Sequence, residues 1–157
     1  MTITEEIAKI CDGIKYREYD VPKEAKQLAK ENNCIIVMGG SDDLMYCYGA
    51  ECYLTDYEEH SIGWDGDTLI DIEDKQLENE AKQLGLRIYW CGKIEWNTKG
   101  YPKEELSIPN YNIKDNGGFF YKVNQNIEHS YFKVMDENEV YCTGIVIKLP
   151  ENFKKYN

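Results

Sequence analysis

Lysine and arginine are absent from the segment between Glu31 and Asp74. That segment carries twelve of the 29 acidic residues, whereas residues 1–30 have six acids and six bases and residues 75–157 have eleven acids and twelve bases. The net charge of −11 is therefore concentrated in the second quarter of the sequence. Because such a segment repels phosphate, it argues against direct binding to nucleic acid and favours a basic partner.

Long apolar runs are also missing. No window approaches the ~20 apolar residues that a membrane-spanning helix requires. The first six residues have neither the positive start nor the apolar core of a signal peptide. We therefore expect a cytoplasmic protein with no membrane partner.

Signatures of metal sites and disulfides are scarce. The six cysteines include no Cys-x-x-Cys pair, and the chain has only two histidines. This pattern gives little support to a zinc site. In a cytosolic chain the default state of cysteine is a reduced and buried thiol, so we expect no disulfide and no cofactor.

The composition that is present, 42% apolar and 30% charged residues in 157 positions, is typical of a single globular domain spanning residues 1–157. Capping residues and apolar periodicity predict about three helices, and β-branched or aromatic runs predict strands. Their order favours an α+β fold with a mainly antiparallel sheet. The expected helices cover residues 3–12, 22–32 and 74–84, the expected strands cover residues 34–38, 44–48, 51–55, 68–72, 86–96, 119–124, 131–135 and 140–149, and residues 56–67 are expected to form an acidic loop.

Tyrosines interleave with the acidic segment. Tyrosine and tryptophan are enriched at the centres of protein interfaces, and at a spacing of about two residues several tyrosines can share one sheet face. Cross-strand packing on a half-buried sheet is the commoner explanation of such a pattern. The candidate partner-binding residues are Asp42, Asp43, Tyr46, Tyr48, Glu51, Tyr53, Asp56, Tyr57, Glu58, Glu59, Trp64, Asp65 and Asp67.

The peptide from Gly39 to Asp43 resembles a ligand-binding loop, because adjacent glycines permit unusual backbone conformations. Acidic residues follow it and no cation does, so a hairpin turn with an Asx cap is the better explanation. One alternative function is a nucleotide-messenger binder, with a cavity at this turn and Arg87, Lys93 or Lys122 facing it. The other is a metal-dependent hydrolase built on Asp42, Asp43 and neighbouring carboxylates, with Glu59, Asp65, Asp67 and Asp71 as further possible cation ligands. Cys91 or Cys142 with His129 forms no recognisable nucleophile motif, so we single out no catalytic residues.

A resemblance to a known family is limited to two stretches of the sequence. These are Ile35-Ile-Val-Met-Gly-Gly-Ser-Asp-Asp-Leu-Met45 and Ile127-Glu-His-Ser-Tyr-Phe-Lys-Val-Met-Asp-Glu-Asn-Glu-Val-Tyr-Cys-Thr-Gly-Ile-Val-Ile147. They resemble a family of small acidic proteins from phages and prophages of low-GC Gram-positive bacteria. The resemblance implies a phage setting and a bacterial host cytosol, and it implies no activity.

Segregated charge and the phage setting together favour a non-enzymatic binding protein. The leading hypothesis is a counter-defence inhibitor that docks an acidic, tyrosine-bearing face onto a basic nucleic-acid-binding surface of a host immune protein. A CRISPR effector is a natural example, since its nucleic-acid channel is strongly positive. In this hypothesis the carboxylates gather on one outward side of the fold.

Overall fold

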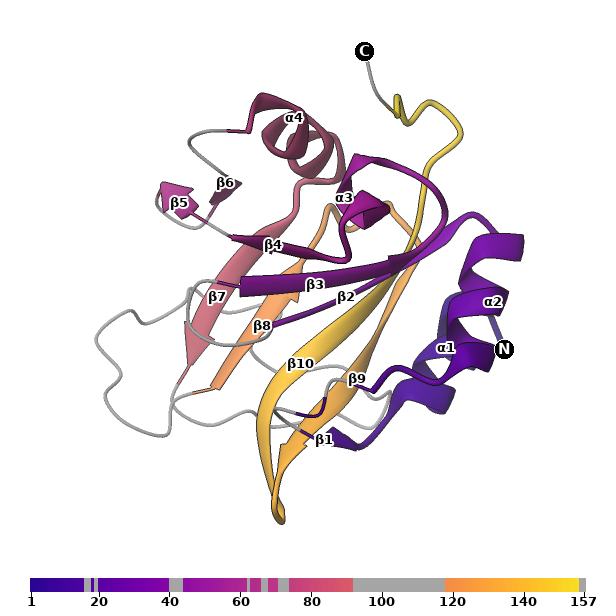
Figure 1. The fold of residues 1–157 in the computed structure, drawn as a ribbon, viewed down its shortest axis with the longest axis vertical. Helices are drawn as coiled ribbons and strands as arrows, with labels where there is room; N and C mark the ends of the chain where they lie inside the picture. The colour runs from indigo at the N-terminus through magenta and orange to yellow at the C-terminus, as the bar shows by residue number, and fades with distance from the viewer. Residues whose placement is uncertain are drawn as a thin grey trace.

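The computed structural model describes residues 1–15, 18, 20–39, 44–61, 63–65, 68–70, 74–91 and 118–155. Within them the chain forms an α+β domain around a curled, mixed sheet (Figure 1). The helices are α1 (Ile3–Cys11), α2 (Lys23–Glu31), α3 (Tyr53–Asp56) and α4 (Lys75–Leu84). The strands are β1 (Ile14–Lys15), β2 (Cys34–Gly39), β3 (Leu44–Gly49), β4 (Glu59–Ser61), β5 (Gly63–Asp65), β6 (Thr68–Ile70), β7 (Arg87–Cys91), β8 (Gly118–Lys122), β9 (His129–Asp136) and β10 (Glu139–Lys148).

Strand β10 organises the sheet. One of its sides pairs with β9, and its other side pairs with β8 near the start of the strand and with β2 near its end. The full order is β4-β3-β2-β10-β8-β7-β6-β5, with β9 joined to β10 and β1 joined to β9. Only the β1–β9 and β8–β10 pairs are parallel among the described strands, which confirms the mainly antiparallel sheet.

The helix ends follow from local capping. The Thr2 side chain accepts the backbone N–H of Glu5 at 3.2 Å and starts α1. Asp74 starts α4 in the same way, and Gly85 ends α4 with the left-handed φ of 67° that glycine adopts at low cost. The three predicted helices are therefore confirmed, each within a residue or two of its expected ends.

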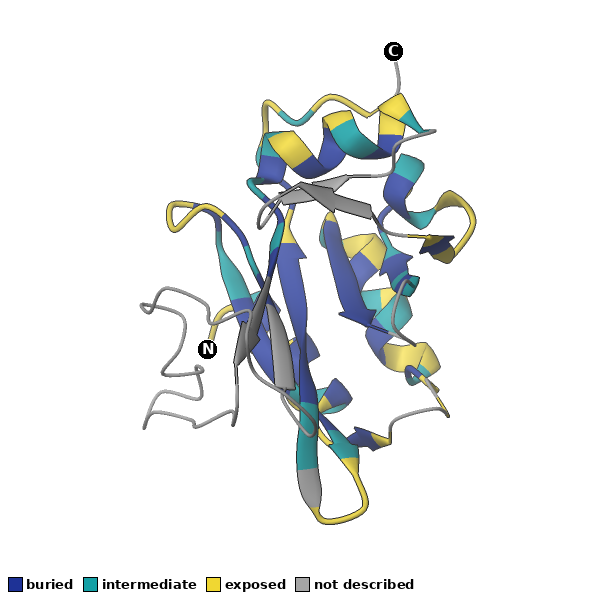
Figure 2. Cartoon of the chain, turned by 90° about the vertical axis from the view of Figure 1, so that its left-hand side faces the viewer, coloured by how far each residue is buried: buried dark blue, intermediate teal, exposed yellow. Residues whose placement is uncertain are grey.

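Helices cover the sheet in two groups. Helices α1 and α2 lie side by side against strands β2, β3, β9 and β10, and α4 lies toward the end of the molecule opposite β1 and the β9–β10 turn (Figure 1). All six residues of β2 are buried, as its apolar run predicts, and buried residues also line the inner sides of the helices (Figure 2). The apolar run of β2 therefore lies at the centre of the core, and buried residues of the helices and of the neighbouring strands complete it.

Two predictions in the acidic segment are wrong. Residues 51–55 do not form a strand, because the chain leaves β3 at Gly49, with φ 122°, and enters the single-turn helix α3. Residues 56–67 are not simply a loop, since β4 pairs with β3 at the sheet edge and β5 pairs with β6. The predicted strand over residues 86–96 is seen as β7, and residues 92–96 lie outside the described residues.

Candidate functional site

The predicted partner-binding residues divide by exposure. Within the described part, the exposed ones come from the turn before α3 and from the end of α3 through β4, a stretch that we call the acidic corner: Glu51, Asp56, Tyr57, Glu58 and Glu59. Tyr46 and Tyr53 are half-buried, and Tyr48 is buried. Trp64 and Asp65 lie on β5, whose side chains are not described, and Asp42, Asp43 and Asp67 lie outside the described residues.

The four predicted partner-binding tyrosines, Tyr46, Tyr48, Tyr53 and Tyr57, do not all share one sheet face. Tyr46 and Tyr48 alternate along β3 and point to the same side of it. Tyr53 opens α3, and Tyr57 follows α3 with 68% of its surface exposed. Of the described tyrosines, Tyr57 is therefore the one best placed to anchor a partner.

A buried carboxylate from α4 holds the corner in place. Glu80 is 1% exposed and accepts the backbone N–H groups of Tyr53 at 3.2 Å and Leu54 at 2.8 Å. These are first-turn N–H groups, which lack partners within a helix. Thr55 completes the start of α3 by accepting the Cys52 N–H at 3.0 Å.

Aromatic contacts add to this support. The Tyr53 hydroxyl donates to the Asp74 carboxylate at the start of α4. Its ring, the Tyr57 ring and the His60 imidazole form a triangle with centroids 6.0–6.2 Å apart. The buried His60 has Nε2 2.8 Å from the Leu54 carbonyl oxygen. The exposed face of the corner thus rests on a packed and hydrogen-bonded base.

The backbone at Glu58 is in an uncommon conformation. Its φ of 60° lies in the left-handed region, where residues other than glycine pay a steric cost. The Glu58 carbonyl accepts the Cys47 N–H at 2.7 Å, which holds the turn against β3. This strained turn places the Glu58 side chain on the surface between Tyr57 and β4.

Negative charge on the corner is not neutralised by ion pairs. Among the described residues, no lysine or arginine lies within ion-pair distance of Glu51, Asp56, Glu58 or Glu59. Burial, followed by a hydrogen bond to the Glu59 carboxylate, raises the pKa of the Tyr46 hydroxyl. In this hydrogen bond the Tyr46 hydroxyl is the donor and the Glu59 carboxylate is the acceptor.

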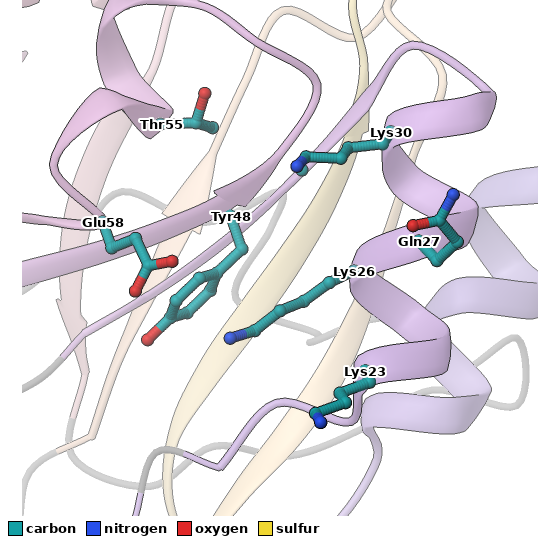
Figure 3. Close-up of a pocket in the computed structure, with 8 residues that line it drawn as sticks. Lys23, Lys26, Gln27, Lys30, Tyr48, Thr55 and Glu58 are labelled. Atoms are coloured by element: carbon teal, nitrogen blue, oxygen red, sulfur yellow. The ribbon is translucent and has the colours of Figure 1, made fainter.

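Sequence reasoning missed the other half of this region. A groove of about 320 Å³ separates α2 from β3, and we call it the lysine groove: Lys23, Lys26, Gln27, Lys30, Tyr48, Gly49, Thr55 and Glu58 (Figure 3). Lys26 reaches across it, with Nζ 4.3 Å from the centre of the Tyr48 ring. The spacing of lysines at positions 23, 26 and 30 places them on one helical face and is the signal that could have found them. Glu58 belongs both to this groove and to the acidic corner.

The nucleotide-messenger alternative placed its cavity elsewhere. It expected the turn after β2, and Gly40 and Lys93 of that hypothesis lie outside the described residues. The lysine groove instead lies where β3 ends, at Gly49, and its cations come from α2. The metal hypothesis rested on Asp42 and Asp43, which are not described, and the described part of the chain holds no group of three potential metal ligands.

A Cys142–His129 pair has no geometric basis. In the β9–β10 register His129 lies opposite Ile147 and Cys142 lies opposite Val134, so the two are five positions apart along the strands. At about 3.4 Å per residue this is roughly 17 Å. Burial also raises the pKa of the Cys142 thiol well above its usual range, which opposes formation of a nucleophilic thiolate.

Comparison with protein-family models, curated proteins and solved structures finds no match to this chain. Across the part of the structure that is described, every helix is too short or too polar to cross a membrane. The functional argument therefore rests on the acidic corner and the lysine groove themselves.

Proposed function

We propose that this chain is a non-enzymatic binding protein that docks its acidic corner onto a positively charged surface of another protein. The observation that carries the proposal is the exposed Tyr57 ring in a stretch with four exposed carboxylates, none of which has an ion-pair partner among the described residues. Tyrosine combines a large contact area with a hydrogen-bonding hydroxyl, and uncompensated carboxylates attract a cationic surface over a Debye length of about 8–10 Å.

The support beneath the corner makes it suitable for docking. Glu80 and His60 fix the backbone of α3 from below, so that little ordering entropy is lost when a partner binds. The short edge strand β4 carries the exposed Glu59 and Ser61, which discourage pairing with strands of other molecules. We therefore expect the partner to contact side chains of the corner and not to add a strand to the sheet.

We further propose that the partner is a nucleic-acid-binding protein of bacterial defence, for example a CRISPR effector, and that the role is counter-defence in the host cytosol. The positive channel of such an effector matches the charge of the corner. The resemblance to phage and prophage proteins supports the same setting.

Charge reversal tests this proposal. The tagged chain is incubated with a panel of purified CRISPR effectors and other defence nucleases, and binding is measured by biolayer interferometry at 50 and 300 mM salt. We expect one effector to bind, more weakly at high salt, and the Asp56→Lys/Glu58→Lys/Glu59→Lys variant to lose at least tenfold in affinity.

The matched control reverses three exposed acids outside the corner, Asp20→Lys/Glu137→Lys/Glu151→Lys, which changes net charge equally. It should retain most of the affinity. The proposal is wrong if no member of the panel binds, if reversal of the corner leaves binding unchanged, or if the control loses as much as the corner variant.

A further inference from the structure

We propose that the lysine groove is a binding site for a small anion that carries a chain of two or three phosphates, such as a nucleoside di- or triphosphate. This inference concerns a different surface from the proposed protein interface, and the two share only Glu58. It does not depend on the identity of the docking partner.

The lysine groove carries a net positive charge, whereas the segment from Glu31 to Asp74 carries a negative one. Three lysines and one carboxylate line the groove, so that a local excess of two positive charges exists in a chain of net charge −11. Lys23, Lys26 and Lys30 make no ion pair with any described residue. Their side chains extend from α2 into the same space (Figure 3). Ammonium groups that line one groove without ion-pair partners among the described residues form a site for an anion.

The other polar groups in the groove are already engaged. Gln27 donates its side-chain amide to Glu31 at 2.9 Å, and the Thr55 hydroxyl donates to the Ala50 carbonyl at 2.7 Å. The face of the Tyr48 ring is covered by the Lys26 ammonium, so it offers no stacking surface for a base on that side. The donors that remain for a ligand are the lysines and the Tyr48 hydroxyl. Burial and, to a smaller extent, the nearby Glu58 charge raise the pKa of this hydroxyl to about 12.

Spacing along α2 selects the length of the anion. Lys23 and Lys30 are seven positions apart, which corresponds to about 10 Å along the helix axis at 1.5 Å per residue. This spacing matches a chain of two or three phosphates better than it matches a single phosphate, because each lysine can then contact a phosphate of its own. The volume of about 320 Å³ lies at the lower limit of small-molecule sites, which suits a compact ligand.

Glu58 limits what the groove accepts. Its carboxylate lies opposite the lysines and repels the end of any anion that extends toward the acidic corner (Figure 3). The same carboxylate would repel a continuous nucleic-acid strand that ran through the groove, so a short phosphate chain is favoured over a polymer. Removal of the Glu58 charge should therefore strengthen phosphate binding while it weakens docking to a basic protein.

The experiment is isothermal titration calorimetry of the full chain with sodium tripolyphosphate and with ATP, without divalent metal, at 150 mM salt. We expect saturable binding of both at a ratio of one per chain. The Lys23→Gln/Lys26→Gln/Lys30→Gln variant should bind at least tenfold more weakly, and Glu58→Gln should bind several-fold more tightly. Tighter binding of ATP than of tripolyphosphate identifies a nucleotide as the ligand class, and equal binding identifies the phosphate chain alone.

The control variant Lys15→Gln/Lys148→Gln/Lys155→Gln removes three exposed lysines that do not line the groove. It should bind within twofold of the wild type, and circular dichroism should show all variants folded. Absence of binding by the wild type, equal losses in both lysine variants, or tighter binding of a single-stranded oligonucleotide than of tripolyphosphate would overturn the inference. Because Glu58→Gln acts in opposite directions on the two sites, failure here is distinct from failure of the docking proposal.

Discussion

The Glu80 carboxylate accepts the backbone N–H of Leu54 at 2.8 Å, although the two residues are 26 positions apart. Its second oxygen accepts the neighbouring Tyr53 N–H. A buried side chain of α4 thus caps the start of α3, a helix that belongs to a different part of the chain. The shape of the acidic corner consequently depends on how α4 packs, and not only on the residues of the corner.

Removing this carboxylate should loosen the corner and destabilise the fold. Glu80→Ala leaves two N–H groups without partners in a buried setting, and we expect the free energy of unfolding to fall by about 2–4 kcal/mol. Glu80→Gln retains one acceptor oxygen and should lose less. Urea denaturation followed by circular dichroism measures both. The neighbouring exposed residue provides the control, since Asn79→Ala should leave stability unchanged or slightly improved. Equal stability of Glu80→Ala and Asn79→Ala would contradict the capping role.

Two substitutions at Glu58 separate the effect of its strained backbone on stability from the effect of its charge on binding. With φ at 60°, glycine at this position relieves a steric cost of roughly 1–2 kcal/mol that alanine retains. Glu58→Gly should therefore be more stable than Glu58→Ala by about 1 kcal/mol, as measured by urea denaturation. Both variants lack the carboxylate, so both should bind tripolyphosphate more tightly than the wild type. If Glu58→Gly proves less stable than Glu58→Ala, the left-handed turn is not the conformation adopted in solution.

Local signals in the sequence accounted for most of the fold. The cap at Thr2, the cap at Asp74 with Gly85, and the apolar run from Cys34 each act over a few neighbouring residues, and the corresponding helices and strand are present. Helix α3 was missed because its first N–H groups bond to Glu80, a contact that no local pattern records. Tyr53 and Thr55 are of residue types with high β propensity, so the sequence favoured a strand there.

The candidate site was predictable only in part for a similar reason. The exposed acids of the corner follow from a segment without cations, and they were expected. The lysine groove brings a helix that precedes this segment against β3, so its cations were counted as part of a balanced N-terminal region. The negative charge that is concentrated in one segment of the sequence therefore lies close to positive charge in the fold at one position, Glu58, which shares the groove with three lysines.

A glycine on β10 is matched to an aromatic ring on β9. Gly144 lies opposite Phe132 in the strand register, and a Cβ added at Gly144 would overlap the Phe132 ring. Gly144→Ala should lower the free energy of unfolding by about 1–3 kcal/mol, because the ring must leave its position in the core. The cost should largely vanish when the ring is already absent, so Gly144→Ala/Phe132→Ala should be nearly as stable as Phe132→Ala alone. A double-mutant cycle by urea denaturation measures this coupling, and strictly additive losses would exclude the ring contact.

Buried thiols should make stability depend on alkaline pH. Burial, followed by the charge of Asp12, raises the pKa of Cys11 from 9.0 to about 12, and burial raises the pKa of Cys34 and of Cys52 to about 11. Above pH 9 the unfolded chain releases these protons while the folded chain retains them. The stabilisation is therefore complete below pH 9 and is lost as the pH rises toward 11 or 12.

The contribution of the Cys11 thiol to this loss of stability at alkaline pH can be measured by comparing the wild type with Cys11→Ala. Each thiol that ionises only in the unfolded chain lowers the free energy of unfolding by about 1.4 kcal/mol per pH unit above 9. The alanine variant lacks one such group, so its stability should fall less steeply than that of the wild type, and the gap between the two should narrow by about 1 kcal/mol between pH 9 and pH 10. Urea denaturation under reducing conditions at pH 7.5, 9 and 10 gives the three gaps. Lysines and tyrosines titrate alike in both proteins, so parallel curves would mean that the Cys11 thiol is open to solvent in the folded chain.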